Sequence, residues 1–386
     1  MPSRMSEAVI CGAVRTPVAR RGGAFKNIHP SDLGAMALNA LVERTGVQPA
    51  QVEDVIFGCV TQVNEQGANV ARQAVLSAGW PVDVPGVSVN RMCGSGQQAM
   101  NFAGALVASG HHDLLVAGGV ESMTRVPIMS DQAPELVAKS ITDQYDIINQ
   151  GLSAEMIADK WNLAREDLDK FALESHKRAI RAIDEKRFER EIKPIQVTQD
   201  GGQILLFATD EHPRRESTLE KLAGLKPAFK PNGKVTAGNS SGINDAACAL
   251  LIANRETAKR LGLPIRATIK QTAVAGVDPT IMLTGPIPAT QKVLAKAKLG
   301  IDDVDLYECN EAFASIPLAW MKETHVPHSK VNVNGGAIAL GHPLGASGAR
   351  LLTTLLHELE RTKKDVGLST MCIGFGQGIA TIIERE

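Results

Sequence analysis

Val52-Glu53-Asp54-Val55-Ile56-Phe57 has a counterpart much later in the chain, Ile301-Asp302-Asp303-Val304-Asp305-Leu306. Each stretch follows a helical pattern that ends in glycine and precedes a strand-like run. A second pair follows downstream in the same order, Val87-Ser88-Val89-Asn90 and Val331-Asn332-Val333-Asn334. The separation from the shared Asp to the final Asn is 36 residues in the first copy and 31 in the second. Two matches in one order at similar spacing indicate two copies of one α/β unit.

Short β-branched runs alternate with amphipathic stretches of helical length along the rest of the chain. Strands are predicted at 7–14, 54–60, 85–90, 113–118, 266–274, 304–309, 329–333, 366–372 and 378–384. Helices are predicted at 32–46, 66–78, 95–109, 153–161, 166–186, 255–261, 288–298, 311–323 and 345–361. Such alternation is typical of layered α/β proteins with mostly parallel or mixed sheets.

The repeat divides the chain into three predicted parts. Residues 1–122 form the first half, which residues 244–265 complete, and residues 266–386 form the second half. Residues 123–243 are an insertion that is more charged and less strand-like. This insertion carries a basic run made of Arg214, Arg215, Lys221, Lys226, Lys230 and Lys234. An insertion between two repeats is a natural substrate-binding lobe, although a basic run is also what an ordinary solvated face contains.

The overall composition is that of a globular protein. The chain has 386 residues, 44% of them hydrophobic and 22% charged, which is enough for two or three domains. A net charge of -1 gives no bulk field for nucleic acid or an anionic membrane, but leaves room for a local basic patch that binds a phosphorylated ligand. No run approaches the roughly 20 apolar residues that span a bilayer, so we expect no membrane span and no signal peptide.

The cysteines predict neither a metal site nor a disulfide framework. They are Cys11, Cys59, Cys93, Cys248, Cys309 and Cys372. None belongs to a C-x-x-C pair, and no histidine lies beside them at metal-ligand spacing. Disulfide frameworks are typical of small secreted domains, so a chain of this size with six thiols indicates a reducing, cytoplasmic location.

Cys93 lies in the turn Asn90-Arg91-Met92-Cys93-Gly94-Ser95-Gly96, between a predicted strand and a predicted helix. The helix field favours an anion at this end, which predicts a lowered thiol pKa. Small neighbours let a substrate carbonyl approach the backbone, whose free N–H groups could hold an oxyanion. The alternative interpretation is a buried cysteine that only packs.

Three more motifs carry candidate chemistry. His342 is the one histidine in the glycine-rich stretch 334–348, where it can serve as the base that activates a thiol, or can merely cap its own loop. Cys372 ends a predicted strand in Met371-Cys372-Ile373-Gly374-Phe375-Gly376-Gln377-Gly378, and turn amides follow it. Asn310 starts the run Asn310-Glu311-Ala312-Phe313-Ala314, where it can act in a site or cap the next helix.

These four motifs together resemble the signatures of the thiolase family. The signatures are the N-x-x-C-G-S-G nucleophile turn, N-E-A-F-A, G-G-A-I-A-x-G-H-P-x-G-A-S-G and C-I-G-x-G-x-G. They occur in the family's order, and the resemblance covers essentially the whole chain. It implies the thiolase fold, in which two repeated α/β halves form a five-layer αβαβα core with an inserted loop domain.

The resemblance also implies a role for each catalytic candidate. Cys93 would be the nucleophile that becomes acylated, and His342 would take its proton. Cys372 would be the second acid/base, which moves a proton at the α-carbon. Asn310 would hold a water and, with His342, polarise the thioester carbonyl. The amides of Cys93 and Gly374 would form the other oxyanion hole.

Coenzyme A is implied as cosubstrate, with no metal or redox cofactor. In the family it lies across the inserted lobe. Ser241, in the loop 236–242, would contact the pantetheine, and Arg214 would meet the nucleotide end. Met282 and Phe313 would line the channel for the acyl and pantetheine groups.

The implied activity is that of an acyltransferase. It would cleave 3-oxoacyl-CoA with coenzyme A into acetyl-CoA and a shortened acyl-CoA through an acyl-Cys93 intermediate, in fatty acid or related β-oxidation. The alternative is an acetoacetyl-CoA thiolase (acetyl-CoA acetyltransferase) that condenses two acetyl-CoA molecules. The implied partners are further copies of the chain, as a homodimer or homotetramer, and a partner protein in a β-oxidation complex. The stretch 121–127 resembles the degradative members more than the biosynthetic ones.

Two positions depart from the family pattern. Phe375 replaces the middle glycine of the usual C-x-G-G-G motif, and its ring either points into the core or narrows the acyl pocket. Asn149-Gln150-Gly151 stands where biosynthetic members commonly have His-Met-Gly, and the segment from Met123 to Ala154 is shorter than theirs. These departures bear on chain length and on dimer versus tetramer more than on the chemistry.

Two other classes of protein compete with this interpretation. Decarboxylating ketosynthases of related fold use one cysteine with two histidines, whereas this chain has a second cysteine turn and the N-E-A-F-A string. Inactive acyl-CoA-binding relatives usually lose the nucleophile or its base, and this chain keeps both Cys93 and His342.

Overall fold

The computed structural model describes residues 7–133 and 136–386. The strands are β1 (Ala8–Arg15), β2 (Ala19–Arg20), β3 (Asp54–Gly58), β4 (Val87–Val89), β5 (Leu114–Ser122), β6 (Ile195–Thr198), β7 (Ile204–Phe207), β8 (Asn244–Asn254), β9 (Ala267–Gly276), β10 (Leu306–Cys309), β11 (Val366–Ile373) and β12 (Gln377–Arg385). The helices are α1 (Pro30–Thr45), α2 (Val70–Ser77), α3 (Ser95–Ala108), α4 (Lys139–Thr142), α5 (Gln150–Lys160), α6 (Arg165–Asp184), α7 (Leu219–Ala223), α8 (Arg255–Arg260), α9 (Pro286–Ala297), α10 (Ser315–Thr324), α11 (Ala337–Leu340) and α12 (Leu344–Thr362).

Local sequence signals set several of these boundaries. Helix α1 has proline in its first turn, and the side chain of His29 caps it by accepting a hydrogen bond from the backbone N–H of Ser31. The same helix ends at Gly46, whose φ of 71° is the left-handed conformation that glycine adopts at helix ends. Strand β1 is buried at every position, as expected for a strand covered on both faces.

The main sheet has ten strands in the order β10-β11-β12-β9-β1-β8-β5-β3-β4, with β2 attached to β8. Two residue pairs, Val9 with Thr268 and Ile10 with Ala267, join β1 to β9 in the middle. This narrow junction divides the sheet into a half built from β4, β3, β5, β8 and β1 and a half built from β10, β11, β12 and β9.

The two halves repeat one topology, which confirms the predicted repeat. In the first half β3 is parallel to β5, β5 is antiparallel to β8, and β8 is antiparallel to β1. In the second half β10 is parallel to β11, β11 is antiparallel to β12, and β12 is antiparallel to β9. The parallel pair β3–β4 has a reduced counterpart, a single bridge between Tyr307 and Val331.

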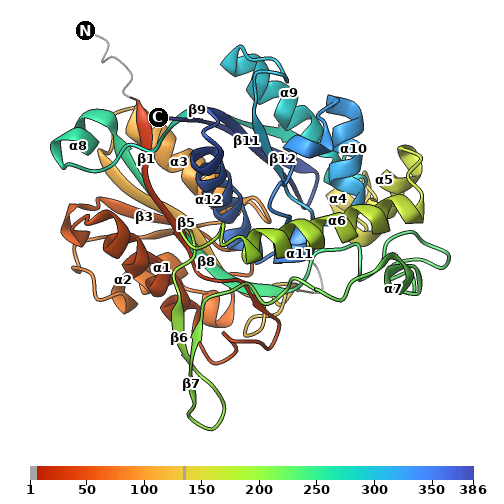
Figure 1. Ribbon diagram of the computed structural model, residues 1–386, viewed down its shortest axis with the longest axis horizontal. Coiled ribbons are helices and arrows are strands. Elements are labelled where there is room, and N and C mark those ends of the chain that lie inside the picture. Colours follow the sequence, from red (N-terminus) through yellow and green to blue (C-terminus); the bar gives the residue numbers. More distant parts are fainter. Residues whose placement is uncertain (1–6, 134–135) are drawn as a thin grey trace.

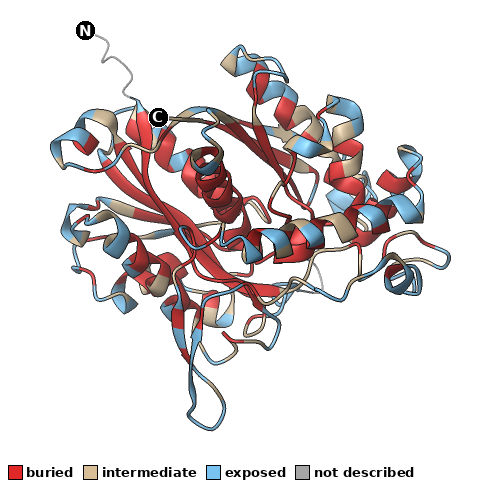
Figure 2. Cartoon of the chain, in the orientation of Figure 1, coloured by how far each residue is buried: buried red, intermediate tan, exposed pale blue. Residues whose placement is uncertain are grey.

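Helices fill three layers around the two half-sheets. Helices α3 and α12 pack on each other and on strands of both halves, so they form the buried central layer (Figure 1). Helices α1 and α2 cover the outer face of the first half, and α9 and α10 lie on the outer side of the second (Figure 1). The result is the expected αβαβα order. Figure 2 shows that α12 and the central strands are buried almost throughout.

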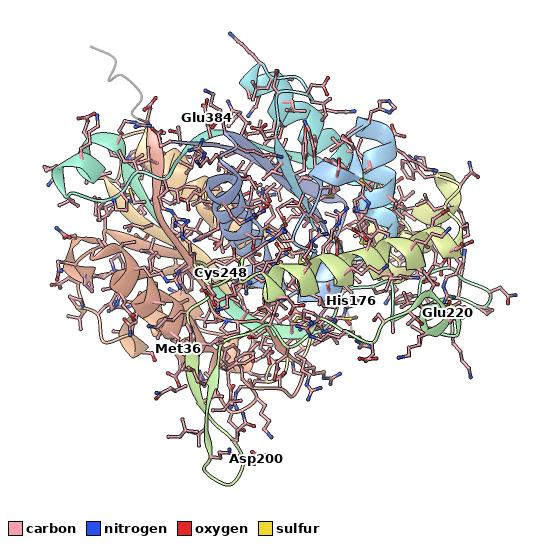
Figure 3. The ribbon with its side chains drawn as sticks, viewed as in Figure 1. Met36, His176, Asp200, Glu220, Cys248 and Glu384 are labelled. Carbon is pink, nitrogen blue, oxygen red and sulfur yellow. The ribbon has the colours of Figure 1, made fainter. Side chains whose placement is uncertain are left out.

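Residues between β5 and β8 carry helices α4 to α7 and the hairpin β6–β7. The hairpin extends away from the sheet, with Asp200 at its tip (Figure 3). A buried ion-pair cluster ties this segment to β1, because the guanidinium of Arg15 donates to the carboxylates of Asp210 and Glu191 at 2.7 Å each. Within the described ranges no helix is both long and apolar enough to cross a membrane.

Most predicted elements are confirmed to within a few residues, but one predicted strand is wrong, one long strand was not predicted and one helix begins later than predicted. Residues 329–333 form no strand; a short 3₁₀ turn, His328–Lys330, precedes the single bridge at Val331. The eleven-residue strand β8 has no counterpart among the predicted strands. The helix predicted from residue 311 begins only at Ser315, because Glu311 is held in a buried turn by side-chain hydrogen bonds.

Candidate active site

Cys93 lies at the turn between the edge strand β4 and the central helix α3, as the sequence predicts. The turn closes with backbone hydrogen bonds from Gly94 N–H to the carbonyl of Arg91 and from Ser95 N–H to that of Met92, both 3.0 Å long. Met92 adopts a φ of 43°, a left-handed value that is costly for a residue with a side chain. The turn therefore holds Cys93 in one fixed direction at the start of α3.

Two backbone N–H groups, those of Cys93 and Gly374, point at the sulfur of Cys93. Burial nevertheless dominates, and it raises the pKa of the Cys93 thiol to about 11 while these two amides lower it. The prediction of a lowered thiol pKa at the helix start is thus wrong for the free protein. Since the thiol is protonated near neutral pH, it needs a base at the moment it attacks.

Cys372 lies near the end of β11, and Gly374 lies in the turn between β11 and β12, which faces the Cys93 turn. Burial, and then the nearby Cys93 sulfur, raise the pKa of Cys372. Phe375 adopts a φ of 59°, and the residue is 41% exposed. Of the two orientations open from the sequence, the one into the core is wrong, and Gly374 is free to direct its N–H at Cys93.

His342 is buried in the loop that precedes α12. Its backbone N–H donates to the side-chain oxygen of Asn244 at 3.2 Å. Its Nδ1 lies 2.6 Å from the hydroxyl oxygen of Ser347, and this hydroxyl donates its own proton to the carbonyl of Pro343. Nδ1 therefore carries the imidazole proton, and Nε2 is left unprotonated, as a hydrogen-bond acceptor.

The electrostatic surroundings keep this imidazole neutral. Burial, and then the guanidinium of Arg350, lower the pKa of His342 to about 3. A neutral ring with an unprotonated Nε2 is the state that can accept a proton from a thiol.

Asn310 lies at the end of β10, where its backbone N–H donates to the carbonyl of Thr370 at 3.0 Å. Its side-chain nitrogen is 3.4 Å from Nε2 of His342. Its side-chain oxygen Oδ1 is buried and has no hydrogen-bond partner among the described residues. A buried amide oxygen without a protein partner is costly, which marks it as an acceptor for a bound molecule. The side chain does not cap α10, which begins five residues later at Ser315.

One apolar cluster brings the Cys93 turn together with the loop that carries His342. Cys93 packs in a cluster that includes Leu344 and the partly buried Ile243. Leu344 follows His342 by two residues, and Ile243 precedes the Asn244 that holds the His342 backbone. The structure thus brings the turn of Cys93, Cys372 and Gly374 against the loop that carries His342.

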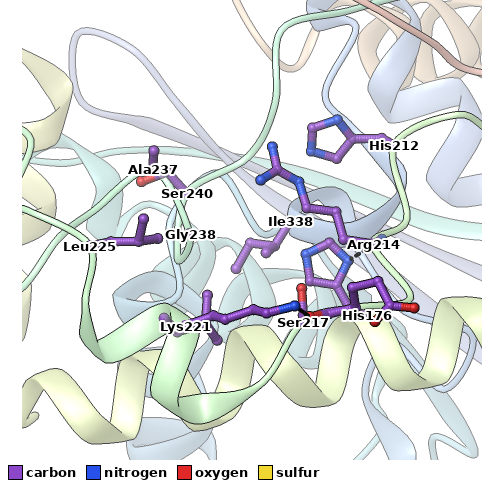
Figure 4. A pocket seen from close by; sticks show the side chains of 12 residues that line it. His176, His212, Arg214, Ser217, Lys221, Leu225, Ala237, Gly238, Ser240 and Ile338 are labelled. Atoms are coloured by element: carbon purple, nitrogen blue, oxygen red, sulfur yellow. Dashed lines mark hydrogen bonds between the residues drawn. The ribbon is translucent and has the colours of Figure 1, made fainter.

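A pocket of about 260 Å³ lies on the inserted segment beside this region (Figure 4). Arg214 reaches into it between His176 and His212, and Ile338 of α11 forms part of its floor (Figure 4). The pocket is lined by Ser240 and not by Ser241, whose backbone N–H instead donates to the carbonyl of Ala312.

The basic run separates into paired and free members. Arg215 pairs with Asp184, and Lys230 and Lys234 both pair with Asp159, so for these three the solvated-face interpretation holds. Within the described ranges Arg214 has no carboxylate partner and is free for an anionic group.

The predicted channel residues share a cluster with the second cysteine. Met282 and Phe313 pack with Cys372 and with Ala154 of α5. The rings of Phe313 and Phe229 meet edge to face with centroids 5.8 Å apart. An apolar wall therefore lies next to Cys372.

Two family models match nearly the whole chain: the thiolase N-terminal domain at residues 8–256 and the thiolase C-terminal domain at residues 263–385. The chain belongs to the thiolase family. A steroid 3-ketoacyl-CoA thiolase of Mycobacterium tuberculosis is 48% identical, over 99% of this chain and 95% of that protein. A 3-ketoacyl-CoA thiolase of Pseudoalteromonas translucida is also 48% identical, over 99% of each chain. The crystal structure of a Bacillus anthracis acetyl-CoA acetyltransferase superposes with a TM-score of 0.91 at 41% identity, covering 99% of this chain and 100% of that one.

Two buried carboxylates of this thiolase hold the His342 loop, and sequence reasoning missed both. Glu121 accepts hydrogen bonds from the N–H groups of Val60, Thr61 and Gly345 and from the side chain of Gln66. Through Gly345, Glu121 connects the first half of the fold to the N-terminus of α12, which directly follows the His342 loop.

Glu311 makes the corresponding connection from the second half. It accepts hydrogen bonds from the hydroxyl of Ser175, the side chain of Asn332 and the backbone N–H of Ile338. The position of Glu311 directly after Asn310, within the N-E-A-F-A string, was the available signal. The imidazole of this thiolase is thus fixed from both halves of the fold.

Proposed function

We propose that this chain is a degradative thiolase that cleaves 3-oxoacyl-CoA with coenzyme A through an acyl-Cys93 intermediate. The observation that carries the proposal is the arrangement around the Cys93 sulfur. The amides of Cys93 and Gly374 point at it, the Cys372 thiol lies near it, and the unprotonated Nε2 of a neutral His342 is available as the base.

In the first step the thiol of Cys93 attacks the 3-oxo carbon and gives its proton to Nε2 of His342. The former carbonyl oxygen becomes an oxyanion, which accepts hydrogen bonds from the amides of Cys93 and Gly374. Each fixed donor of this kind contributes about 3 kcal/mol to lowering the barrier. Since the thiol has a pKa of about 11, transfer of its proton during the attack avoids the cost of a free buried thiolate.

In the second step the bond between C2 and C3 breaks, and its electron pair forms the enolate of acetyl-CoA. The enolate oxygen accepts hydrogen bonds from the Nε2–H of protonated His342 and from a water held by Oδ1 of Asn310. Cys372 protonates the enolate carbon, and acetyl-CoA leaves. The acyl group stays on Cys93 until a second coenzyme A gives its thiol proton to the Cys372 thiolate and attacks the thioester carbon. Cys93 then leaves as the acyl-CoA forms, and its sulfur takes back the proton held by His342.

Coenzyme A occupies the pocket on the inserted segment in this proposal. Its phosphates meet Arg214, and its pantetheine passes the loop 236–242 near Ser240 and Ser241 toward Met282 and Phe313. The supporting observation is that Arg214 is exposed to this pocket and has no carboxylate partner among the residues that the structure describes, whereas Arg215, next to it, is paired with Asp184. The proposal includes no metal and no redox cofactor.

The proposed assembly is a homodimer or homotetramer in the cytoplasm, with or without a β-oxidation partner protein. Support comes from the free edge of the sheet at β4, where Val87 is 40% exposed, and from Phe102 on α3, which is 43% exposed. Exposed apolar side chains beside an unpaired strand are typical of subunit contacts. Sedimentation equilibrium of the native chain and of Phe102→Asp tests this; a native monomer contradicts it.

The decisive experiment is thiolysis of a chain-length series of 3-oxoacyl-CoA substrates with free coenzyme A, run beside Cys93→Ala. Cleavage of medium or long chains by the native protein only is the expected result. Cleavage of acetoacetyl-CoA alone would favour the acetyl-CoA acetyltransferase alternative. No cleavage of any substrate would refute the proposal.

A further inference from the structure

Gln150 presents an unpaired carboxamide next to the Cys93 turn. It is the first residue of α5, where the side chain of Asn149 caps the helix by accepting from the N–H of Gly151. The Gln150 side chain is half-buried, and within the described ranges no hydrogen bond is made to it. Since the side chain is only half-buried, this amide is open to water in the free protein, and a ligand that covers it must supply a replacement hydrogen bond or leave it unpaired.

The Gln150 amide adjoins the proposed oxyanion hole. A β-carbon built on Gly374 would lie 3.0 Å from Nε2 of Gln150 and 3.5 Å from the terminal methyl carbon of Met92. A side chain at position 374 would therefore press on the Gln150 amide, and glycine at this position lets the amide lie beside the backbone of residue 374. The backbone N–H of Gly374 points at the Cys93 sulfur, so the Gln150 amide lies near the group that becomes attached to Cys93.

The remaining wall is apolar. Gly151 lies against the ring of Phe229, since a β-carbon there would be 2.2 Å from it, and that ring packs on Phe313. Ile148, two residues before Gln150, packs at the margin of the same cluster as Phe229 and Cys372. One polar group in an otherwise apolar wall is the arrangement that fixes the orientation and identity of a ligand.

We propose that Gln150 selects 3-oxoacyl groups that carry a hydrogen-bonding oxygen on the acyl chain a few bonds beyond the 3-oxo carbon. This inference rests on the proposed function and names its substrate class. A carboxylate, hydroxyl or carbonyl oxygen there accepts from the Gln150 amide, whereas a plain methylene chain covers the amide and leaves it unpaired. Gln150 therefore discriminates in two ways. It attracts an oxygenated chain through a hydrogen bond, and it disfavours a plain chain because its own amide is then left unpaired.

The test uses three six-carbon substrates: 3-oxohexanoyl-CoA, 5-hydroxy-3-oxohexanoyl-CoA and 3-oxoadipyl-CoA. We expect the native protein to cleave at least one oxygenated substrate with a kcat/KM about tenfold above that for 3-oxohexanoyl-CoA, the factor that one hydrogen bond supplies. Gln150→Met, of nearly the same length, brings this ratio close to one by lowering the oxygenated value and raising the plain one. Gln150→Glu lowers kcat/KM for 3-oxoadipyl-CoA most, because two carboxylates then repel.

Gln144→Met, at an exposed position in the preceding segment, is the matched control, and thermal unfolding verifies that each variant is folded. An unchanged ratio in Gln150→Met, or an equal loss on all three substrates, overturns the inference, since Gln150 then touches only what the substrates share. If the native protein cleaves none of the three but does cleave other members of the chain-length series, this inference alone is overturned; if it cleaves no 3-oxoacyl-CoA at all, the proposed function fails and this inference fails with it.

Discussion

Ser347→Ala tests how the His342 imidazole is held. The hydroxyl oxygen of Ser347 accepts from Nδ1–H of His342 at 2.6 Å, and Ser347 is fully buried. The substitution leaves a buried N–H without a partner, which costs about 1–3 kcal/mol. The ring can then turn or change tautomer, and either change withdraws Nε2 from the Cys93 proton. At about 1.4 kcal/mol per factor of ten, kcat should fall roughly 10- to 100-fold, with KM for coenzyme A little altered.

Two assays separate orientation from damage to the fold. The first is steady-state thiolysis of acetoacetyl-CoA, and the second is the rate at which iodoacetamide alkylates Cys93 between pH 6 and 9. Thr354→Val is the control, because Thr354 is a buried hydroxyl on the same helix that donates to Glu191 at 3.1 Å, away from the imidazole. A loss of kcat below twofold in Ser347→Ala, or an equal loss in Thr354→Val, would refute the reasoning.

Three further predictions concern the other groups of the site and the buried histidines. Asn310→Ala removes the acceptor that holds the proposed water, so kcat for thiolysis should fall about 100-fold; a normal kcat contradicts that role. Arg214→Ala should raise KM for coenzyme A about tenfold in steady-state kinetics, whereas Arg215→Ala should not. Burial lowers the pKa of His342 and His357 to about 3, so their contribution to stability is present above pH 6.5 and is lost as pH falls towards 3. Urea unfolding should show a loss of about 1.4 kcal/mol per pH unit for each in that window; equal stability at pH 7 and pH 5 would disagree.

The fold could largely be predicted from the sequence because its two repeated halves contain similar sequence stretches. The pair of stretches at 52–57 and 301–306 leads into β3 and β10, which occupy equivalent places in the two halves. Strand β8 was not predicted because its alanine-rich sequence has low β-propensity. Its burial between β1 and β5 imposes the strand conformation, and that information lies elsewhere in the chain.

The site residues could be predicted from the sequence where they lie in glycine-rich turns. Cys93 and His342 stand in such turns, and the structure brings both to one region. The supporting residues were hidden, because Glu121 and Glu311 look like ordinary surface carboxylates until the fold buries them. The prediction of a lowered Cys93 thiol pKa was wrong for the same reason, since the burial that raises this pKa depends on the whole fold.

Acylation of Cys93 is the most direct test of the account. The protein is incubated with a 3-oxoacyl-CoA in the absence of free coenzyme A, quenched in acid, digested and analysed by mass spectrometry. The account predicts one acyl group on the peptide that contains Cys93 and none on the peptide that contains Cys372, with the label released by added coenzyme A. An unmodified Cys93, or an acyl group on Cys372, would contradict it.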